Sequence, residues 1–429
     1  MHSELCNRCG SCVGLSGGKI IFKNKEKKYR PEIVGEVSAD EAERLWNACP
    51  GKEFNFPKYR KHFYPATTNF HEYTGPYESF YIGYANDNTI RKNSASGGLI
   101  SAILIYLLDK KKIDGAITLR MSKDKPWLSE PFVATTREEI LEAAQSKYTI
   151  SSVNEILAQT SEFNGRLAYV GIPPQVQSIR KLQKANDPSV RNIEYIFGPF
   201  YGNTLFFSSI KSFLKSYKES DYTKIKKLYF RYGEWPGSMR IEMKSGKIIQ
   251  LKKFHANYLI PFHIVTNSLY CTDFTNEFTD ISGGDAWAPV YEERGKGFSL
   301  IITRNNKGQV LLESMINDGY LTVDPISKNQ AIEMHSHGYD FKKRGSFIRI
   351  ELRKIIGQSI PNYGYKPGGI PLRRYLMEMI INSLFWILSS KVARYAVEQI
   401  PPETIGKLFE KTRTIWKKST YSIKRDNLA

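Results

Sequence analysis

The middle of the chain alternates between short apolar runs and amphipathic stretches, which predicts strands and helices in turn. Short apolar runs bounded by turn residues are typical of buried strands, whereas apolar residues that recur every three or four positions are typical of helices. From residue 77 onward the predicted strands are 80–84, 115–119 and 167–171, and the predicted helices are 99–108, a segment opening at 136, and 178–183. This order predicts an α/β domain with a largely parallel sheet.

After residue 225 the period of the pattern shortens to two. Residues 228–232, 239–243 and 247–251 alternate in a way that predicts a β-meander, and Lys244-Ser245-Gly246 turns the last two strands as a hairpin. One more strand is expected over 298–303. The predicted fold class is therefore α/β (α+β), with an antiparallel meander added to the main sheet.

The first 57 residues do not show the strand–helix alternation of the middle of the chain. Their short apolar runs lie between loops that carry cysteines. Residues 20–22 and 33–34 predict two short strands. Ser38, with Glu41 three positions later, has the spacing of a capping box, which predicts the start of a helix. These features predict a small module over residues 1–57.

Two further segments flank the α/β region. Residues 58–76, rich in aromatic and turn-forming residues, are expected to be a linker draped over the next domain. Residues 346–429 are expected to be a basic helical tail, with one long helix over 373–398, a break at Pro401-Pro402 and a second helix over 403–418. Apolar residues together with Lys, Arg and Trp suit a helix lying in a membrane interface. The alternative is a tail packed on its own domain or on a partner subunit.

Length and charge narrow the class of protein. The 429 residues allow two to three domains with a sizeable core. The net charge of +19 suits acidic partners, such as nucleic acid, anionic lipid or an acidic redox protein or cofactor. Met1-His2-Ser3-Glu4 has no apolar signal-peptide region, and no run of 18 apolar residues follows. We therefore expect a cytoplasmic protein, with peripheral membrane association through the tail as one of the two alternatives given above.

Four of the five cysteines form a pattern typical of an iron–sulfur cluster. Cys6, Cys9 and Cys12 form a CxxCxxC loop, and Cys49 follows much later in a Cys-Pro pair. Such a loop brings three thiolates to three irons, and in two-cluster ferredoxins the cysteine before proline ligates the other cluster. Ser16 stands where the first run would have its fourth cysteine, so three plus one ligands make one complete [4Fe–4S] cluster. Zinc is the alternative, although this spacing favours iron–sulfur.

The sequence does not contain the motifs of several other kinds of catalytic or metal site. There is no Walker A motif, no GxGxxG after a strand and no GxSxG, which argues against nucleotide hydrolysis and serine chemistry. His335 and His337 form a His-Ser-His triplet, but no carboxylate pattern completes a metal site around them. No residue is assigned as catalytic from the sequence.

A set of further motifs follows the cysteine loop in a characteristic order. They are residues 91–98 (RKNSASGG), 145–148 (QSKY), 170–177 (VGIPPQVQ), 229–237 (YFRYGEWPG), 270–274 (YCTDF) and 280–287 (DISGGDAW). This order resembles the beta-subunit family of coenzyme F420 hydrogenases and dehydrogenases, over roughly residues 1–345; coenzyme F420 is a deazaflavin hydride carrier. The family also includes chlorophyll-modifying reductases. The resemblance implies a ferredoxin-like [4Fe–4S] module over 1–57 and an FAD-binding catalytic domain over 77–345.

The resemblance also implies where FAD binds. The Asn-Ser-Ala-Ser-Gly-Gly turn opens a helix, and its small residues let backbone N–H groups approach a phosphate or a flavin edge; the alternative is a tightly packed helix cap. Tyr148 is a candidate for stacking on the flavin ring, and the alternative is a buried structural tyrosine. Residues 280–285 would form the second wall of the flavin pocket, and the alternative is a plain turn. The implied cofactor-binding residues are Asn93, Ser94, Ala95, Ser96, Gly97, Gly98, Ser146, Lys147, Tyr148, Pro173, Gln175, Asp280, Ser282, Gly284 and Asp285.

The sequence departs from the family at a second, inner cluster. Many members hold that cluster with cysteines of a Pro-Cys-Gln loop, of the next strand and of a CxxC pair. Here the corresponding residues are Pro174, Tyr201, Ser268 and Cys271, so only one thiol remains. We expect the inner cluster to be absent. Electrons must then pass directly between the N-terminal cluster and FAD, which requires the cluster module to fold over the flavin.

The function implied by the resemblance is a flavin- and iron–sulfur-dependent oxidoreductase. Electrons would pass between reduced coenzyme F420, or a related hydride donor, FAD and the [4Fe–4S] cluster, and then to ferredoxin or a partner subunit, in either direction. No nucleic-acid partner is expected. One alternative is a ferredoxin-dependent reductase of an organic substrate, like the chlorophyll-type relatives. The other is a non-catalytic, cluster-bearing adaptor subunit.

Overall fold

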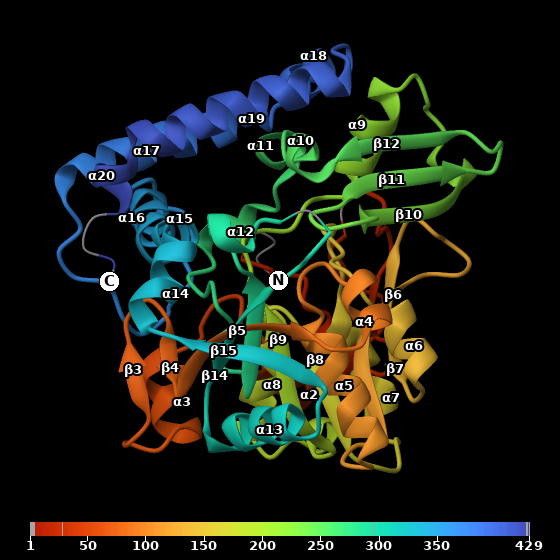
Figure 1. Ribbon diagram of the computed structural model, residues 1–429, viewed down its shortest axis with the longest axis vertical. Helices are drawn as coiled ribbons and strands as arrows, with labels where there is room; N and C mark the ends of the chain where they lie inside the picture. The colour runs from red at the N-terminus through yellow and green to blue at the C-terminus, as the bar shows by residue number, and fades with distance from the viewer. Residues whose placement is uncertain (1–4, 28, 294, 426–427, 429) are drawn as a thin grey trace.

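An eight-stranded sheet forms the centre of the protein (Figure 1). The computed structural model describes residues 5–27, 29–293, 295–425 and 428, so the Met1–Glu4 segment lies outside the described residues. The strands across the sheet are, in order, β15 (Leu321–Ile326), β5 (Ser79–Ala85), β14 (Ser299–Thr303), β13 (Ile281–Asp285), β9 (Ile193–Pro199), β8 (Leu167–Val170), β6 (Gly115–Met121) and β7 (Ser129–Ala134).

The sheet is mixed rather than largely parallel. The pairs β13–β9, β9–β8 and β8–β6 are parallel, and the other four pairs are antiparallel. The α/β class is thus confirmed, with parallel pairing limited to the centre. The difference has a local cause: β6 to β7 and β13 to β14 are joined without a crossover α-helix, and strands joined in this way pair antiparallel.

Helices cover both faces of the sheet. On one face α5 (Leu99–Asp109) and α13 (Asn306–Asn317) share a core with the strands, and on the other α8 (Pro173–Lys184) does. The helix expected over 178–183 begins five residues earlier, because Pro173 is favourable in the first turn of a helix. The shorter helices of this region are α4 (Asn88–Lys92), α6 (Arg137–Glu142), α7 (Leu157–Thr160), α12 (Thr266–Tyr270), α14 (Lys328–Met334) and α15 (Ser336–Tyr339).

The predicted meander is present and has its own core. Strands β10 (Ile225–Tyr232), β11 (Ser238–Met243) and β12 (Ile248–Lys252) pair antiparallel in sequence order. Gly246 lies in the predicted hairpin turn with φ +86°, a conformation that glycine adopts without strain. Three helices pack beside the meander, namely α9 (Ser208–Ser216), α10 (Lys253–Ala256) and α11 (Leu259–His263).

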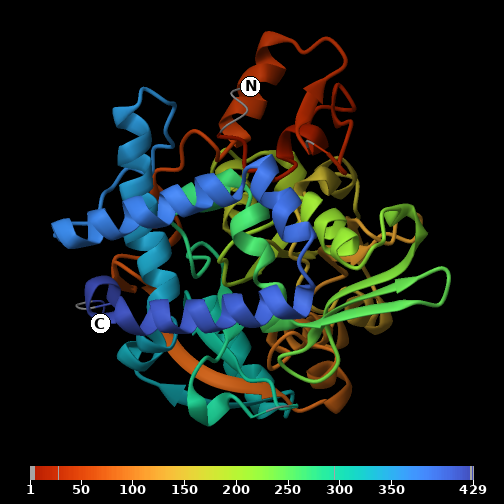
Figure 2. The same ribbon diagram turned by 90° about the horizontal axis from the view of Figure 1, so that it is seen from above.

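The N-terminal module lies at one edge of the molecule and packs against the α/β region (Figure 2). Its elements are α1 (Ser11–Gly14), β1 (Ile20–Phe22), β2 (Pro31–Ile33) and α2 (Ala39–Ala48). The predicted capping box is confirmed: Ser38 Oγ accepts from the Glu41 N–H at 3.3 Å, and Glu41 Oε2 accepts from the Ser38 N–H at 2.9 Å. Local sequence therefore fixed the start of α2.

The segment expected as a linker, residues 58–76, is more regular than predicted. It contains most of α3 (Phe56–Phe63) and two short paired strands, β3 (Asn69–His71) and β4 (Gly75–Tyr77). Asn55 starts α3, because its Oδ1 accepts from the Lys58 N–H at 2.9 Å. The ring of Phe56 packs edge-on against Phe278 at 5.4 Å, which anchors the helix to the core. Aromatic residues that resemble a linker in sequence are thus packing residues.

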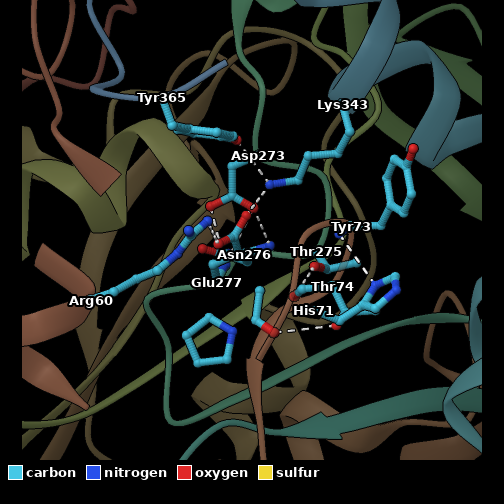
Figure 3. Close-up of polar contacts among 12 residues, drawn as sticks. Arg60, His71, Tyr73, Thr74, Asp273, Thr275, Asn276, Glu277, Lys343 and Tyr365 are labelled. Atoms are coloured by element: carbon cyan, nitrogen blue, oxygen red, sulfur yellow. Dashed lines mark hydrogen bonds and ion pairs between the residues drawn. The ribbon is translucent and has the colours of Figure 1, made fainter. Parts of the chain in front are cut away.

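A buried ionic cluster ties α3 to the rest of the protein (Figure 3). Glu277 is fully buried and forms ion pairs with Arg60 Nη2, at 2.8 Å, and with Lys343. Asp273 accepts from the N–H groups of Asn276, at 2.8 Å, and Glu277, at 3.1 Å. The loop before β13 is therefore held between a helix that precedes the sheet and a helical turn that follows it.

The long helices of the tail lie across the top of the molecule in Figure 1 and face the viewer in Figure 2. Its helices are α16 (Ser346–Ile355), α17 (Leu372–Leu388), α18 (Lys391–Glu398), α19 (Pro402–Ser419) and α20 (Tyr421–Arg425). The single helix expected over 373–398 is wrong, because Ser390 caps a new helix: its Oγ accepts from the Ala393 N–H at 3.2 Å. No single described helix is long and apolar enough to cross a membrane, and α17 with α18 reach that length only as a pair bent by 72°.

Candidate functional site

One large cavity, of about 880 Å³, lies beside the end of β13 and under the tail. This volume is within the range of cofactor sites. Ten of the fifteen predicted cofactor-binding residues line it, namely Ser94, Ala95, Ser96, Gly98, Ser146, Lys147, Tyr148, Gln175, Gly284 and Asp285. The structure thus brings segments from four sequence motifs to one place.

Three other predicted residues have structural roles instead. Gly97 is in tight contact, since a Cβ there would lie 2.5 Å from the Gly83 carbonyl oxygen. The Asn93 side chain donates to the Thr89 carbonyl at 2.9 Å. Pro173 opens α8 and, among the described residues, is not part of the cavity lining.

Residues 280–285 were predicted to form the second wall of the flavin pocket, but only the last residues of this segment line the cavity. Asp280 Oδ2 accepts from the Ile196 N–H at 2.8 Å, and Ser282 Oγ accepts from the Arg304 guanidinium at 2.8 Å. Both side chains are therefore bonded within the fold, and among the described residues neither lines the cavity. The reason is the direction of β13, whose carboxyl end, at Gly284 and Asp285, lines the cavity while its start lies away from it.

The small-residue loop presents the start of α5 to the cavity. Gly98, with φ +88°, is the residue before the helix, and the first-turn residues 99–101 line the cavity. Ser94 Oγ donates to the Ile90 carbonyl and Ser96 Oγ to the Phe298 carbonyl, both at 2.7 Å, so the two hydroxyls hold the loop in shape. The free N–H groups and positive dipole at a helix start favour an anionic group there.

Arg231 organises the polar wall of the cavity, and the sequence analysis did not assign it. Its guanidinium donates to Tyr148 Oη at 3.0 Å and to the Ala95 carbonyl at 2.5 Å, and it pairs with Asp285 at 3.3 Å. Trp235 Nε1 donates to the same carboxylate at 2.9 Å. Arg231 and Trp235 both belong to the YFRYGEWPG motif. The sequence feature that could have identified Arg231 as a site residue is its position among the aromatic residues of a predicted strand.

Tyr148 is the titratable group at the centre of this network. Burial alone would raise the pKa of its phenol, but the charges of Arg231 and Lys253 outweigh burial and lower the pKa below its usual value. Burial also lowers the pKa of Lys253. A phenol between two cations releases its proton more readily than a free tyrosine.

Lys147 lines the cavity, but its ammonium group is engaged by the backbone. Its Nζ donates to the carbonyls of Ala143, at 2.5 Å, Ala144, at 2.8 Å, and Gln145, at 3.2 Å, just beyond α6. Burial lowers the pKa of this amine to about 7. The lysine thus fixes the loop that carries Tyr148 to the cavity.

The four candidate cluster ligands come together at the N-terminal module. Burial raises the pKa of Cys6, Cys9 and Cys12, and each is also close enough to other thiols of the set, Cys49 included, for their charges to raise its pKa further. Burial is the larger cause and raises the pKa of Cys9 to about 12. Within the described ranges no three His, Cys, Asp or Glu side chains converge as ligands of a single ion. Four thiols are a donor set that fits the predicted cluster, and zinc is the alternative that the same donor set allows.

The cysteine loop is seated on a segment that also forms the cavity. Asn154 N–H donates to the Cys9 carbonyl at 3.1 Å, and Ser152 Oγ donates to the Arg8 carbonyl at 2.7 Å. A Cβ on Gly10 would lie 2.7 Å from the Glu155 nitrogen, so the contact is tight. The adjacent residues Ser151 and Val153 line the cavity. One short segment therefore separates the cysteines from the cavity.

The positions of the family's inner cluster are filled by packed side chains. Tyr201 Oη and Ser268 Oγ are hydrogen-bonded at 2.7 Å, and the ammonium group of Lys342 lies 4.4 Å from the Tyr201 ring centre. Cys271 is buried, and burial raises the pKa of its thiol to about 11. A buried thiol with such a pKa is a packing residue rather than a reactive one.

Family models match most of the region that carries the cavity. The N-terminal model of the coenzyme F420 hydrogenase/dehydrogenase beta subunit matches residues 80–158, and the C-terminal model of the same subunit matches residues 164–329. The chain belongs to this family. Helices α16 to α20 lie outside both matched ranges.

Individual relatives support the assignment. The coenzyme F420-dependent sulfite reductase of Methanocaldococcus jannaschii is 25% identical over 367 residues, which are 80% of this chain but only 51% of that protein, so the chain spans about half of its length. The coenzyme F420 hydrogenase subunit beta of Methanococcus voltae is 31% identical over 58% of this chain and 84% of its own. A chain of the F420-reducing [NiFe] hydrogenase complex from Methanosarcina barkeri shares the fold, with a TM-score of 0.55 at 22% identity, over 68% of this chain and 99% of that one.

Proposed function

We propose that the protein is an oxidoreductase that passes electrons between reduced coenzyme F420, FAD and one [4Fe–4S] cluster, and from there to ferredoxin or a partner subunit. The observation that carries this proposal is the segment 151–155, which forms part of the cavity wall and also seats the cysteine loop. The similar proteins named for coenzyme F420 chemistry favour that hydride donor.

The residues of the cavity suit a flavin dinucleotide. The start of α5 offers N–H groups and a positive dipole to a phosphate, and aromatic side chains, Phe230 and Trp287 among them, offer apolar surface to a ring system. Arg231 positions Tyr148 and Asp285 through its hydrogen bonds, and Tyr148 holds a proton at Oη inside the cavity. When bound, a flavin couples two-electron hydride transfer to single-electron steps.

The cluster would be held by Cys6, Cys9, Cys12 and Cys49. Thiolates are the ligands that such clusters require, and a bound metal removes the protons that burial would otherwise retain. Lys181 Nζ donates to the Cys49 carbonyl at 2.8 Å, which fixes the distant ligand against α8. A cationic side chain beside the cluster also favours its reduced, more negative state.

The first test is the composition and spectrum of the protein purified without oxygen. We expect about four irons and four sulfides per chain, and the visible bands of an oxidised flavin after loading with FAD. Reduced coenzyme F420 should bleach those bands, whereas NADH should not. A protein that holds four irons but no flavin would contradict the enzyme and favour the cluster-bearing adaptor. Bleaching only by reduced ferredoxin would favour the organic-substrate reductase.

We propose that the tail contacts an anionic membrane surface. In α17 the usual arrangement of a surface helix is reversed, because the buried side carries charged residues and the exposed side is apolar. Two of the three side chains that it buries are charged: Arg374 and Glu378 are 0% exposed, and Arg374 forms two bonds to Asp340, at 2.7 and 2.9 Å. The side chains that it exposes are apolar, with exposed fractions of 46–78%, and they are Leu372, Leu376, Met379, Ile380, Leu384, Trp386 and Ile387. A helix that turns its apolar face outward is expected to meet an apolar phase.

The shape and charge of this end favour lipid as that phase. Helices α17, α18 and α19 lie across the top of the molecule and form a U in the view from above (Figure 2). Trp386 is 78% exposed, and Lys391 and Lys407, both exposed, provide positive charge beside the apolar residues. Tryptophan and lysine beside apolar side chains are typical of helices that lie in a membrane interface.

Vesicle flotation tests this contact. The protein should float with vesicles that contain phosphatidylglycerol, and Leu376→Gln, Leu384→Gln, Trp386→Gln together should weaken binding at least about 100-fold, since each buried apolar side chain contributes about 1.5–3 kcal/mol. The matched control changes three exposed apolar residues elsewhere, Val290, Ile248 and Val310, to Gln. Equal flotation of all three proteins, or a native protein that instead forms dimers without lipid, would overturn the membrane contact. Point variants are preferable to deletion of residues 373–429, which would also remove Arg374 and Glu378 from the core.

A further inference from the structure

The cavity has a cationic wall that comes from the tail. Arg413 and Lys417 of α19 and Arg425 of α20 line it, together with His337. All four residues lie beyond residue 329, where the family match ends. This part of the site therefore belongs to the segment that the family models do not describe.

The packing of α19 explains how these cations reach the cavity. Gly406 lets the helix approach α10 closely, since a Cβ there would lie 2.6 Å from the Cβ of His255. Glu410, Arg413 and Lys417 follow Gly406 at intervals of four, three and four residues, which places them on the same face of the helix. Figure 1 shows α19 lying over α10.

Two of the cations on this wall, Arg413 and Lys417, have no direct ion-pair partner among the described residues. In the part of the chain that the structure describes, the side chains of Arg413 and Lys417 form no hydrogen bond or ion pair with another residue. Arg425 Nη2 donates to the Lys417 carbonyl at 2.9 Å, so the positive groups are close together. Burial and the charges of Arg413, Arg425 and Lys424 lower the pKa of Lys417 to about 7.

The acidic groups of the cavity are either engaged or exposed. Glu410 pairs with His255 at 3.1 Å, and Asp285 is bonded by Arg231 and Trp235. Glu292 and Glu333 also line the cavity, but both are exposed to solvent. Positive groups held together at low exposure repel one another, and a bound anion would relieve this repulsion.

We propose that Arg413, Lys417 and Arg425 form an anion site that holds a phosphate or carboxylate group of the ligand in the cavity. The tail would then complete the redox site. This inference rests on the proposed function in one respect, because it assumes that the ligand of the cavity is a redox cofactor or a hydride carrier. Arginine is suited to the role because its planar guanidinium can bind two oxygens of a phosphate or carboxylate at once.

The direct test uses inorganic pyrophosphate as the probe and isothermal titration of the full-length protein. We expect the native protein to bind pyrophosphate, and Arg413→Gln with Lys417→Gln to weaken binding at least about 10-fold, because each removes a hydrogen bond to a charged group. The control is Lys411→Gln with Lys418→Gln, which removes the same charge from exposed positions of α19. The control should change affinity less than about twofold, since exposed charges are screened by salt. No binding by the native protein, or equal loss in both variants, would overturn the site.

A second set of ligands identifies the source of the anion. If the group belongs to the cofactor, the double variant should bind FAD and FMN more weakly but riboflavin normally. If it belongs to the hydride carrier, the double variant should bind coenzyme F420 more weakly but its phosphate-free deazaflavin core normally. Unchanged affinity for all five ligands would overturn the proposal. Pyrophosphate binding without any flavin binding would instead leave the anion site standing and contradict the proposed oxidoreductase.

Discussion

Cys49→Ser is expected to abolish the iron–sulfur cluster and, with it, electron delivery from the flavin to a protein acceptor. The Cys49 thiol is the one ligand that comes from outside the CxxCxxC loop, and three thiols cannot complete a four-iron site. The variant should contain far less iron than the native protein. Reduction of ferredoxin should fall to background, whereas bleaching of the flavin by reduced coenzyme F420 should continue.

Cys271→Ser is the matched control for this prediction. Cys271 is buried and lies among Ser268, Tyr201 and Lys342 rather than beside the other cysteines. Its replacement should leave about four irons per chain. Flavin binding by both variants reports that the catalytic region is folded. Four irons retained in Cys49→Ser would show that the proposed ligand set is wrong.

Glu277→Gln is expected to have the largest effect on stability. The carboxylate is fully buried between Arg60 and Lys343, whose side chains are 16% and 2% exposed, so its replacement removes the carboxylate that pairs directly with both cations. Breaking a buried ion pair in this way costs about 3–5 kcal/mol. The free energy of unfolding, measured by urea denaturation, should fall by about that amount. Glu293→Gln is the control: Glu293 pairs with Lys296 at 2.8 Å on the surface, and the change should cost less than about 0.5 kcal/mol.

The same carboxylate predicts a pH dependence. Burial by itself would raise the pKa of Glu277, but Lys343 and Arg60 lower it to about 2 from an ordinary value of 4.5. A depressed pKa in the folded state adds stability that is present above pH 4.5 and is lost as the pH falls toward 2. Over that interval the native protein should lose stability more steeply than Glu277→Gln. If the free energy of unfolding falls equally steeply with pH in both proteins, Glu277 is not held as a carboxylate in the folded state.

Some features of the site were predictable from the sequence because they depend on neighbours along the chain. The CxxCxxC spacing predicts the cluster loop, the Ser38–Glu41 pair predicts the start of α2, and alternation with a period of two predicts the meander. The small-residue loop before α5 and the motif around Tyr148 belong to the same class, since a short stretch identifies each of them. Ten of the predicted cofactor residues belong to such short stretches and line one cavity.

Other features depend on the direction in which an element lies and could not be read from its sequence. Asp280 and Asp285 belong to one motif, but β13 carries only Asp285 to the cavity, while Asp280 bonds to the backbone of β9. The apolar residues of the tail were recognised, but only the packing of Arg374 against Asp340 shows that their side of α17 points outward.

By itself, then, the sequence determined the family, the α/β class and the set of four cysteines, because each follows from residue types at short spacings. The tertiary structure decided which residues share the cavity. Arg231 reaches Ala95 across 136 positions, and Arg413 and Lys417 reach the same cavity from a tail outside the family match. The physical reason is that such contacts depend on how helices and strands pack, and residue spacing along the chain carries little information about packing between distant segments.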